Sequence, residues 1–148
     1  MINKKLIESK LTDLKTYFEK LALLLKEDVR SIVSDDLKLP TVERRFQLIV
    51  DTAIDINTHL IKESNLATPD DYQSTFITLG ENGILPMELA LKIAPSVGLR
   101  NLVVHKYGQV DLKKMVEDIK SEIGQYFDYA REIDRFIKDK KDKPTSTP

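Results

Sequence analysis

The stretch VERRFQLIVDTAIDINTHLI, residues 42–61, decides the fold. Its apolar residues recur every three or four positions, which is the spacing of one face of an α-helix. That face consists of Val42, Phe46, Ile49, Val50, Ala53, Ile56, Leu60 and Ile61. The segment is more apolar than the helix predicted before it, so we expect it to lie at the centre of a helical bundle. Thr41 is a suitable N-cap residue and is the predicted start.

Four further segments show the same helical spacing. They cover residues 7–25, 72–79, 86–107 and 112–137. Asp111 is the predicted N-cap of the last helix. Pro95 falls inside the helix over 86–107, and it should kink or split that helix because proline removes a backbone hydrogen bond. The pattern predicts an all-α fold, an up-and-down bundle of about five helices.

Length and composition limit the class of protein. A chain of 148 residues fits one domain. An apolar fraction of 41% and a charged fraction of 32% are typical of a soluble helical protein. The absence of cysteine excludes disulfides, thiolate zinc sites and cysteine nucleophiles. We expect the bundle to cover residues 1–138 and a disordered, charged tail to cover residues 139–148.

The charge balance and the N-terminus bear on partners and location. The formal net charge is -1, so any phosphate binding must come from a local cluster of cations. No apolar run reaches the length of a membrane span. Residues 1–5 have neither the apolar segment nor the cleavage site of a signal peptide. The expected location is the cytoplasm, with no membrane partner.

Three polar residues of the central helix share one face. Asp51, Asp55 and His59 lie four residues apart. Carboxylates and a histidine on one face can bind a metal ion, but the sequence supplies no second cluster of such ligands beside them. We therefore predict ion pairs and a hydrogen-bonded histidine here, and no metal site.

Two other groups of residues receive structural interpretations. Arg44 and Arg45 are predicted to form surface ion pairs with Glu43 rather than to extend a nucleic-acid path. An aromatic group near the C-terminus is predicted to belong to the core and the bundle surface rather than to a platform for stacking bases. Its members are Tyr126, Phe127 and Tyr129.

The stretch RNLVVHKYG, residues 100–108, combines residue types that suit phosphodiester chemistry. The guanidinium of Arg100 could bind a phosphate through two hydrogen bonds. The imidazole of His105 could transfer protons near neutral pH. Asn101, four residues before His105, could orient the imidazole or bind a ligand oxygen. The residues alone favour a simpler alternative, in which the helix dipole stabilises a C-terminal histidine and the arginine forms a salt bridge.

This stretch resembles the R-x(4)-H motif of HEPN domains, and specifically the longer R-N-x-x-x-H-x-Y form of the HepT branch. The resemblance extends over nearly the whole chain. Residues 43–61 resemble the second helix of the family, and residues 72–86 resemble its third helix and the turn that follows. Residues 98–107 are close to the family signature.

The resemblance implies a dimeric helical bundle that cleaves RNA without a metal or a cofactor. It further implies the toxin of a type VII-like toxin–antitoxin pair. Arg100 and His105 would be the catalytic pair, supported by Asn101. On a single helix the catalytic pair point about 140° apart, and in the family two copies of the motif face each other across a homodimer to form one cleft for RNA.

The resemblance also implies a protein partner. In HepT pairs a minimal nucleotidyltransferase antitoxin, MntA-like, transfers AMP from ATP to the motif tyrosine, which is Tyr107 here. O-AMP-tyrosine at this position would block the cleft and repel RNA phosphates. The residues alone favour a helix-terminal aromatic that covers the core. The alternative function is a non-catalytic HEPN module for protein interaction or nucleotide binding, although the presence of both Arg100 and His105 counts against it.

Overall fold

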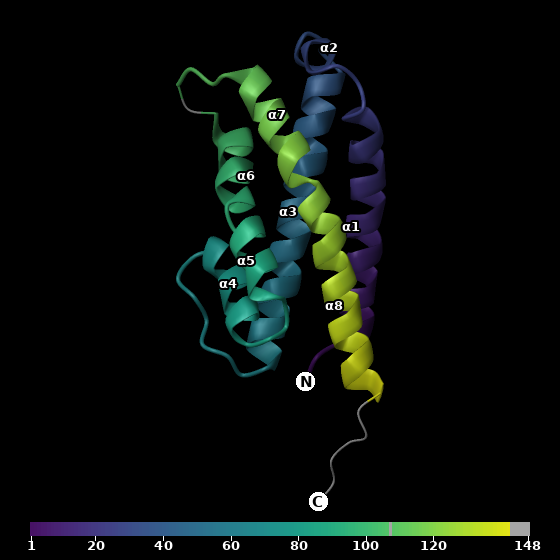
Figure 1. Ribbon diagram of the computed structural model, residues 1–148, viewed down its shortest axis with the longest axis vertical. Helices are drawn as coiled ribbons and strands as arrows, with labels where there is room; N and C mark the ends of the chain where they lie inside the picture. The colour runs from purple at the N-terminus through teal and green to yellow at the C-terminus, as the bar shows by residue number, and fades with distance from the viewer. Residues whose placement is uncertain (107, 143–148) are drawn as a thin grey trace, which may run out of the picture.

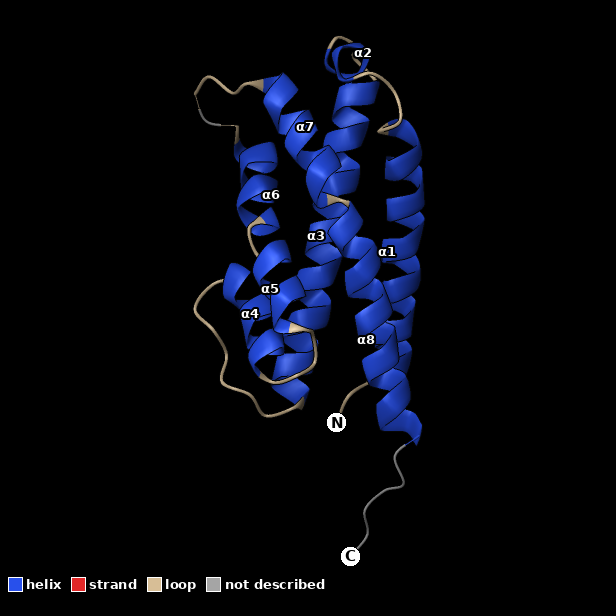
Figure 2. Ribbon diagram, in the orientation of Figure 1, coloured by secondary structure: helices blue, strands red, loops and turns tan. Residues whose placement is uncertain are grey.

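The computed structural model describes residues 1–106 and 108–142, and in these residues the chain forms eight α-helices and no strand (Figures 1 and 2). The predicted all-α bundle is therefore confirmed. No helix in this part of the chain is both long and apolar enough to cross a membrane. The helices are α1 (Lys4–Leu24), α2 (Val29–Val33), α3 (Lys38–Glu63), α4 (Gln73–Glu81), α5 (Met87–Ile93), α6 (Ser96–His105), α7 (Leu112–Glu122) and α8 (Gly124–Asp142).

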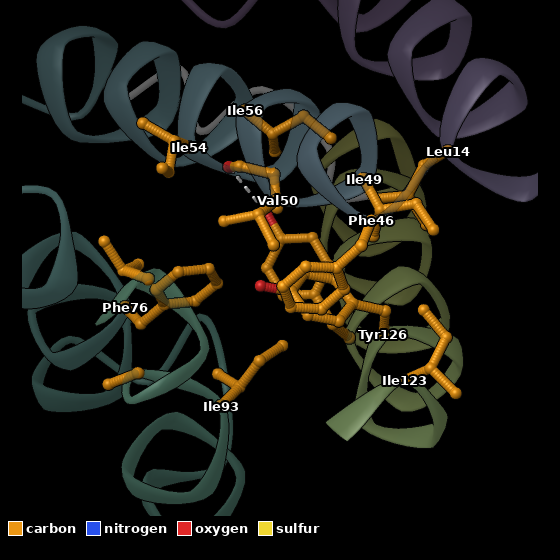
Figure 3. Packing of buried hydrophobic residues seen from close by; sticks show 14 of the residues in the cluster. Leu14, Phe46, Ile49, Val50, Ile54, Ile56, Phe76, Ile93, Ile123 and Tyr126 are labelled. Carbon is orange, nitrogen blue, oxygen red and sulfur yellow. Dashed lines mark hydrogen bonds between the residues drawn. The ribbon is translucent and has the colours of Figure 1, made fainter. Parts of the chain in front are cut away.

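The core is built around α3, as predicted. This helix packs against α1 on one side and against α4 and α6 on the other (Figure 1). All eight apolar residues of its predicted face are buried. Phe46, Ile49 and Val50 lie close to Tyr126 of α8, opposite Phe76 of α4 (Figure 3). Each of the larger side chains contributes about 1.5–3 kcal/mol when fully buried, so this face is a main source of the stability of the bundle.

The predicted start of α3 at Thr41 is wrong, because the helix begins three residues earlier at Lys38. The side chain of Asp35 caps it. One carboxylate oxygen of Asp35 accepts from the backbone N–H of Leu37 at 2.8 Å and of Lys38 at 3.0 Å. Pro40 is tolerated because the first turn of a helix has no use for its missing N–H. The hydroxyl of Thr41 donates to the carbonyl of Leu37 at 2.7 Å.

The number of helices also differs from the prediction of about five. Pro95 splits the fourth predicted helix into α5 and α6, as expected for a residue without a backbone N–H. The fifth predicted helix breaks at Ile123, where the backbone tightens and the N–H of Tyr126 donates to the Ile123 carbonyl at 3.1 Å. The neighbouring Gly124 lowers helix propensity at that point. Helix α2 was not predicted, and α8 continues to Asp142, past residue 138.

Buried tyrosines join α8 to the rest of the bundle. The hydroxyls of Tyr126 and Ser96, the first residue of α6, are hydrogen-bonded at 2.5 Å. The hydroxyl of Tyr129 donates to Asn57 Oδ1 at 2.6 Å and to the Ala53 carbonyl at 3.1 Å. Burial raises the pKa of Tyr126 and of Tyr129, which keeps both phenols neutral. The predicted core role of these two residues is confirmed, whereas Phe127 between them is 58% exposed on the bundle surface.

Candidate catalytic site

The motif predicted from the sequence occupies the second half of α6 and the residues that follow it. The helix ends at His105, and Lys106 then takes the left-handed conformation, with φ of 42°. The N–H of Lys106 donates to the Leu102 carbonyl at 2.9 Å and closes the last turn. Arg100 is half-buried, and Asn101 and His105 are exposed. Tyr107, the predicted modification site, lies outside the described residues.

An acid of α3 holds the motif arginine. Oδ1 of Asp51 lies 2.8 Å from Nε and 2.7 Å from Nη2 of Arg100, so the carboxylate takes the side edge of the guanidinium. The third nitrogen, Nη1, donates to Asn101 Oδ1 at 2.8 Å. The side chain of Arg100 is 20% exposed and that of Asp51 34%, so the pair is partly shielded from water. The rotamer of Arg100 is thus fixed from two sides.

This arrangement leaves part of the arginine available. A guanidinium carries five N–H groups, and three of them are used by Asp51 and Asn101. Within the described residues, Nη1 and Nη2 each keep one N–H without a protein acceptor. N–H groups of a planar guanidinium donate strong, charge-assisted hydrogen bonds to phosphate oxygens. The site can therefore grip an anionic phosphoryl group without losing its own ion pair.

A second ion pair links the end of the motif to α3. Nζ of Lys106 pairs with Oε2 of Glu43, whose side chain is only 13% exposed. The prediction that Glu43 pairs with Arg44 or Arg45 is wrong, because the acid turns toward the end of α6 and Arg44 instead donates to Gln47 at 3.3 Å. The Lys106 pair offsets part of the cost of a left-handed backbone at a non-glycine residue.

The outer stripe of α6 is exposed. It consists of Gly98, Asn101, Leu102 and His105, which follow the spacing of one helical face. A Cβ atom placed on Gly98 would meet no heavy atom within 4 Å, so nothing in the described part of this chain requires glycine there. Arg100 turns inward to α3 while His105 is on the outer stripe, which agrees with the predicted divergence of about 140° between them.

The three polar residues predicted to share a face of α3 have separate partners. Asp51 bonds Arg100, Asp55 pairs with Lys10 of α1 at 3.5 Å, and Nε2 of His59 accepts from the backbone N–H of Asn3 at 3.0 Å. The predicted ion pairs and hydrogen-bonded histidine are confirmed. In the part of the chain that the structure describes, no three His, Cys, Asp or Glu side chains are grouped so as to hold a metal ion.

Sequence reasoning missed the acids that pair with the motif. Asp51 appeared only as a member of a possible metal cluster, and Glu43 only as a partner for its neighbours. A signal was present, because the two acids are eight residues apart, about two helical turns, on the helix predicted to be central. The pairing itself could not be found without knowing that α6 packs on that side of α3.

Comparison with known protein families and sequences gives a consistent picture. The family model described as "Ribonuclease HepT-like" matches residues 10–133. A tRNA nuclease HepT from Aphanizomenon flos-aquae is 42% identical over 97 residues, which are 64% of this chain and 65% of that protein, just under two thirds of its length. A putative RNase from Archaeoglobus fulgidus is 26% identical over 122 residues, which are 79% of this chain and 92% of that protein.

Solved structures share the fold. The tri-AMPylated HEPN toxin of Shewanella oneidensis, solved in complex with its MNT antitoxin, superposes with a TM-score of 0.79 at 22% identity. That match covers 88% of this chain and 97% of the toxin. The cytosolic protein YutE of Bacillus subtilis superposes with a TM-score of 0.74 at 15% identity, over 95% of this chain and 96% of that protein. At these identities the likeness establishes the fold alone.

Proposed function

Because the chain belongs to the Ribonuclease HepT-like family of HEPN proteins, we propose that it is a metal-independent RNA endonuclease and the toxin of a type VII-like toxin–antitoxin pair. The observation that carries the proposal is the setting of Arg100. Asp51 and Asn101 hold its guanidinium, and one N–H on each of Nη1 and Nη2 is left to donate to a phosphate. The relative from Aphanizomenon flos-aquae is named a tRNA nuclease, and a further relative from Shewanella oneidensis is named an mRNA nuclease. Both names support the same class of reaction.

The proposed mechanism uses groups of the RNA and of the motif only. The 2′-oxygen of the RNA attacks the adjacent phosphorus, a new P–O bond forms, and the bond from phosphorus to the 5′-oxygen of the next nucleotide breaks. His105 transfers protons, accepting one from the 2′-hydroxyl or delivering one to the leaving 5′-oxygen. Arg100 stabilises the negative charge on the phosphoryl oxygens. The products are a 2′,3′-cyclic phosphate and a 5′-hydroxyl.

One copy of the site holds one histidine, whereas the reaction needs a proton removed at one oxygen and a proton added at another. A homodimer through the outer stripe of α6 would bring two His105 side chains to one cleft. The stripe supports this, since it is exposed, and Gly98 would let a second helix approach closely. Two copies of Arg100 would also concentrate positive charge in a chain of net charge -1.

The dimer has a test that spares the monomer. Gly98→Trp places a large side chain where the described part of this chain has no atom within 4 Å of the new Cβ, so the bundle should fold normally. We expect the variant to be monomeric by sedimentation velocity and to lose RNA cleavage. Gly124→Ala is the matched control at another exposed helical glycine with open space around it, and it should stay dimeric. A dimeric, active Gly98→Trp would rule out this face.

We further propose that a nucleotidyltransferase antitoxin silences the enzyme by adenylylating Tyr107. The family's solved toxin–antitoxin complex contains an AMPylated toxin, which supports this route. Adenylylation forms a bond between the phenolic oxygen and the α-phosphorus of ATP and releases pyrophosphate. After co-expression with a minimal nucleotidyltransferase of the MntA type, intact-mass analysis should show added adenylate that is absent in Tyr107→Phe. An unmodified wild-type protein would contradict the proposal.

The ribonuclease itself is tested in the presence of EDTA. Purified protein is incubated with total RNA beside Arg100→Ala and His105→Ala, and the new RNA ends are identified by their phosphates. Cleavage by the wild type alone, with cyclic phosphate ends, supports the mechanism. Cleavage that requires added metal, or that both variants retain, would rule it out. No cleavage, with tight binding of a nucleotide or a protein, would favour the non-catalytic HEPN module.

A further inference from the structure

A hollow beside the motif is used by none of the steps above. It is lined by the loop that joins α3 to α4, by the start of α4 and by α6. Its volume is about 670 Å³, within the range of small-molecule sites. Asn101 lines it and also accepts the hydrogen bond from Arg100, so the hollow and the arginine share this residue. Other lining residues are Thr58, Thr68, Tyr72, Ser74 and Val97.

Tyr72 supplies an exposed aromatic ring at this hollow. The residue is 56% exposed, which is unusual for a side chain that could bury a large apolar area. Among the described residues, one other aromatic side chain is similarly exposed, that of Phe127 at 58%. Its ring packs against that of Phe18, with centroids 6.1 Å apart, on the far side of the bundle. Exposed rings beside a catalytic site are what proteins use to stack unpaired bases.

The backbone at Tyr72 is held by a buried polar chain. Its carbonyl accepts from the hydroxyl of Thr75 at 2.6 Å, and that hydroxyl accepts from Nδ2 of Asn57 at 3.0 Å. Asn57 Oδ1 accepts from the hydroxyl of Tyr129 at 2.6 Å. Asn57 and Tyr129 are fully buried, and Thr75 is 5% exposed. A satisfied network of this kind is rigid, so it holds in place the backbone from which the ring projects and lowers the entropy lost on binding.

The lining selects between parts of a nucleotide. Carboxylates of Asp70 and Asp71 stand at the hollow and disfavour a phosphate there. The hydroxyls of Thr58, Thr68 and Ser74 and the amide of Asn101 also line the hollow, and such groups can form hydrogen bonds with the edge of a base. The Thr58 hydroxyl already donates to the Ile54 carbonyl at 2.8 Å, so toward a base it would act as an acceptor. We infer, resting on the proposed ribonuclease function, that this hollow binds the unpaired base of a nucleotide flanking the cleaved phosphodiester, stacked on Tyr72.

The test first maps the bond that the wild type cuts and then uses a short single-stranded RNA with a 2′-deoxy nucleotide at that position. Binding is measured by fluorescence anisotropy. Tyr72→Ala should weaken binding about tenfold, because one stacked base is lost. Tyr72→Phe should bind like the wild type, since the ring is kept. Phe127→Ala, which removes an equally exposed ring elsewhere, should also bind like the wild type.

A cycle with the substrate shows where the ring acts. An abasic residue is placed on either side of the cleaved bond in turn. At one of these positions the abasic residue should weaken binding to the wild type about tenfold, and it should not weaken binding to Tyr72→Ala any further. Cleavage by Tyr72→Ala at saturating RNA should stay near the wild-type rate, with the loss confined to KM.

The inference falls if Tyr72→Ala binds as tightly as the wild type, if Tyr72→Phe loses as much as Tyr72→Ala, or if both abasic positions remain additive with the substitution. Thermal melting of each variant checks that it is folded. Tyr72→Leu is a second variant without the aromatic ring, for use if Tyr72→Ala does not fold. In all these outcomes the wild type still cleaves RNA, so the ribonuclease proposal stands. Should the wild type cleave no RNA, that proposal fails and the inference fails with it.

Discussion

The two histidines of this chain have opposite settings. His59 lies within α3, half-buried, and its Nε2 accepts the backbone N–H of Asn3 at 3.0 Å, which ties the N-terminus to the bundle. His105 is the last residue of α6 and lies on an exposed stripe, five residues after Arg100. A histidine that lies near carboxylates in the sequence therefore need not belong to a functional site. Its neighbours in the tertiary structure indicate whether it stabilises the fold or is available for a reaction.

The aspartates of α3 repeat this contrast one helical turn apart. Asp51 faces α6 and bonds Arg100 at 2.7 and 2.8 Å, with a side chain 34% exposed. Asp55 faces α1 and pairs with Lys10 at 3.5 Å, with a side chain 61% exposed. An exposed pair of this kind is worth little to stability, while a pair that holds the proposed catalytic arginine is expected to act on the reaction.

The largest expected effect comes from replacing each histidine by alanine in turn. His105→Ala should lower the rate of RNA cleavage by about 10²- to 10⁴-fold, the usual range for a lost general acid or base. His59→Ala should leave the rate near that of the wild type, because His59 interacts with the backbone of Asn3 and with Glu63 and not with Arg100 or Asn101. Initial rates on one defined RNA provide the measurement. Equal losses in two well-folded variants would show that the division between the histidines is wrong.

The aspartates provide the next test. Asp51→Asn keeps the shape of the side chain and removes the charge that holds Arg100, so the rate at saturating RNA should fall about tenfold. Asp55→Asn, on the same helix and opposite Lys10, should have no effect on the rate. Asp51→Glu is expected to recover part of the loss. If Asp51→Asn and Asp55→Asn cut RNA at the same rate, Asp51 does not position the arginine.

For a buried residue that only supports the fold, we predict a change in stability without a change in the rate of RNA cleavage. Tyr129→Phe leaves the buried Asn57 Oδ1 without its donor, which should lower the free energy of unfolding by about 1–3 kcal/mol. Tyr17→Phe is the control, because that hydroxyl forms no hydrogen bond within the described residues. Urea unfolding gives the energies. A catalytic defect in Tyr129→Phe at a temperature where it is folded would contradict the separation.

The smallest expected effect concerns the cap of α3. Hydrogen bonds from the backbone N–H of Lys38 and then of Leu37 lower the pKa of the Asp35 carboxyl. A depressed pKa means that the ionised acid stabilises the fold above its unfolded pKa of about 3.9 and that this stability is lost as the pH falls through the lower folded value. Asp35→Ala should therefore be less stable than the wild type at pH 7, and the difference should shrink in strong acid.

The control for the cap is Asp36→Ala, an exposed acid one residue along. Its urea midpoint should track that of the wild type at each pH. A gap between Asp35→Ala and the wild type that stays constant down to strong acid would show that the carboxylate charge has no part in the cap.

Much of the fold could be predicted because helical spacing is a local property of the chain. The buried face of α3, the N-cap at Asp111 and the break at Pro95 follow from residue type and period. The start of α3 and the split at Ile123 could not, since both depend on which backbone groups find partners. At Lys38 the partner is the side chain of Asp35, and nothing in the apolar pattern marks it.

Periodicity and the order of residue types along the chain were enough to predict the helical fold and the family, and to propose Arg100, Asn101 and His105 as site residues. Only the tertiary structure decided which acid serves the arginine. Asp51 and Asp55 are the same residue type one turn apart, and the helix packed against each gives one an arginine and the other a lysine. The hollow beside Tyr72 is likewise decided by packing, since its walls come from α3, α4 and α6.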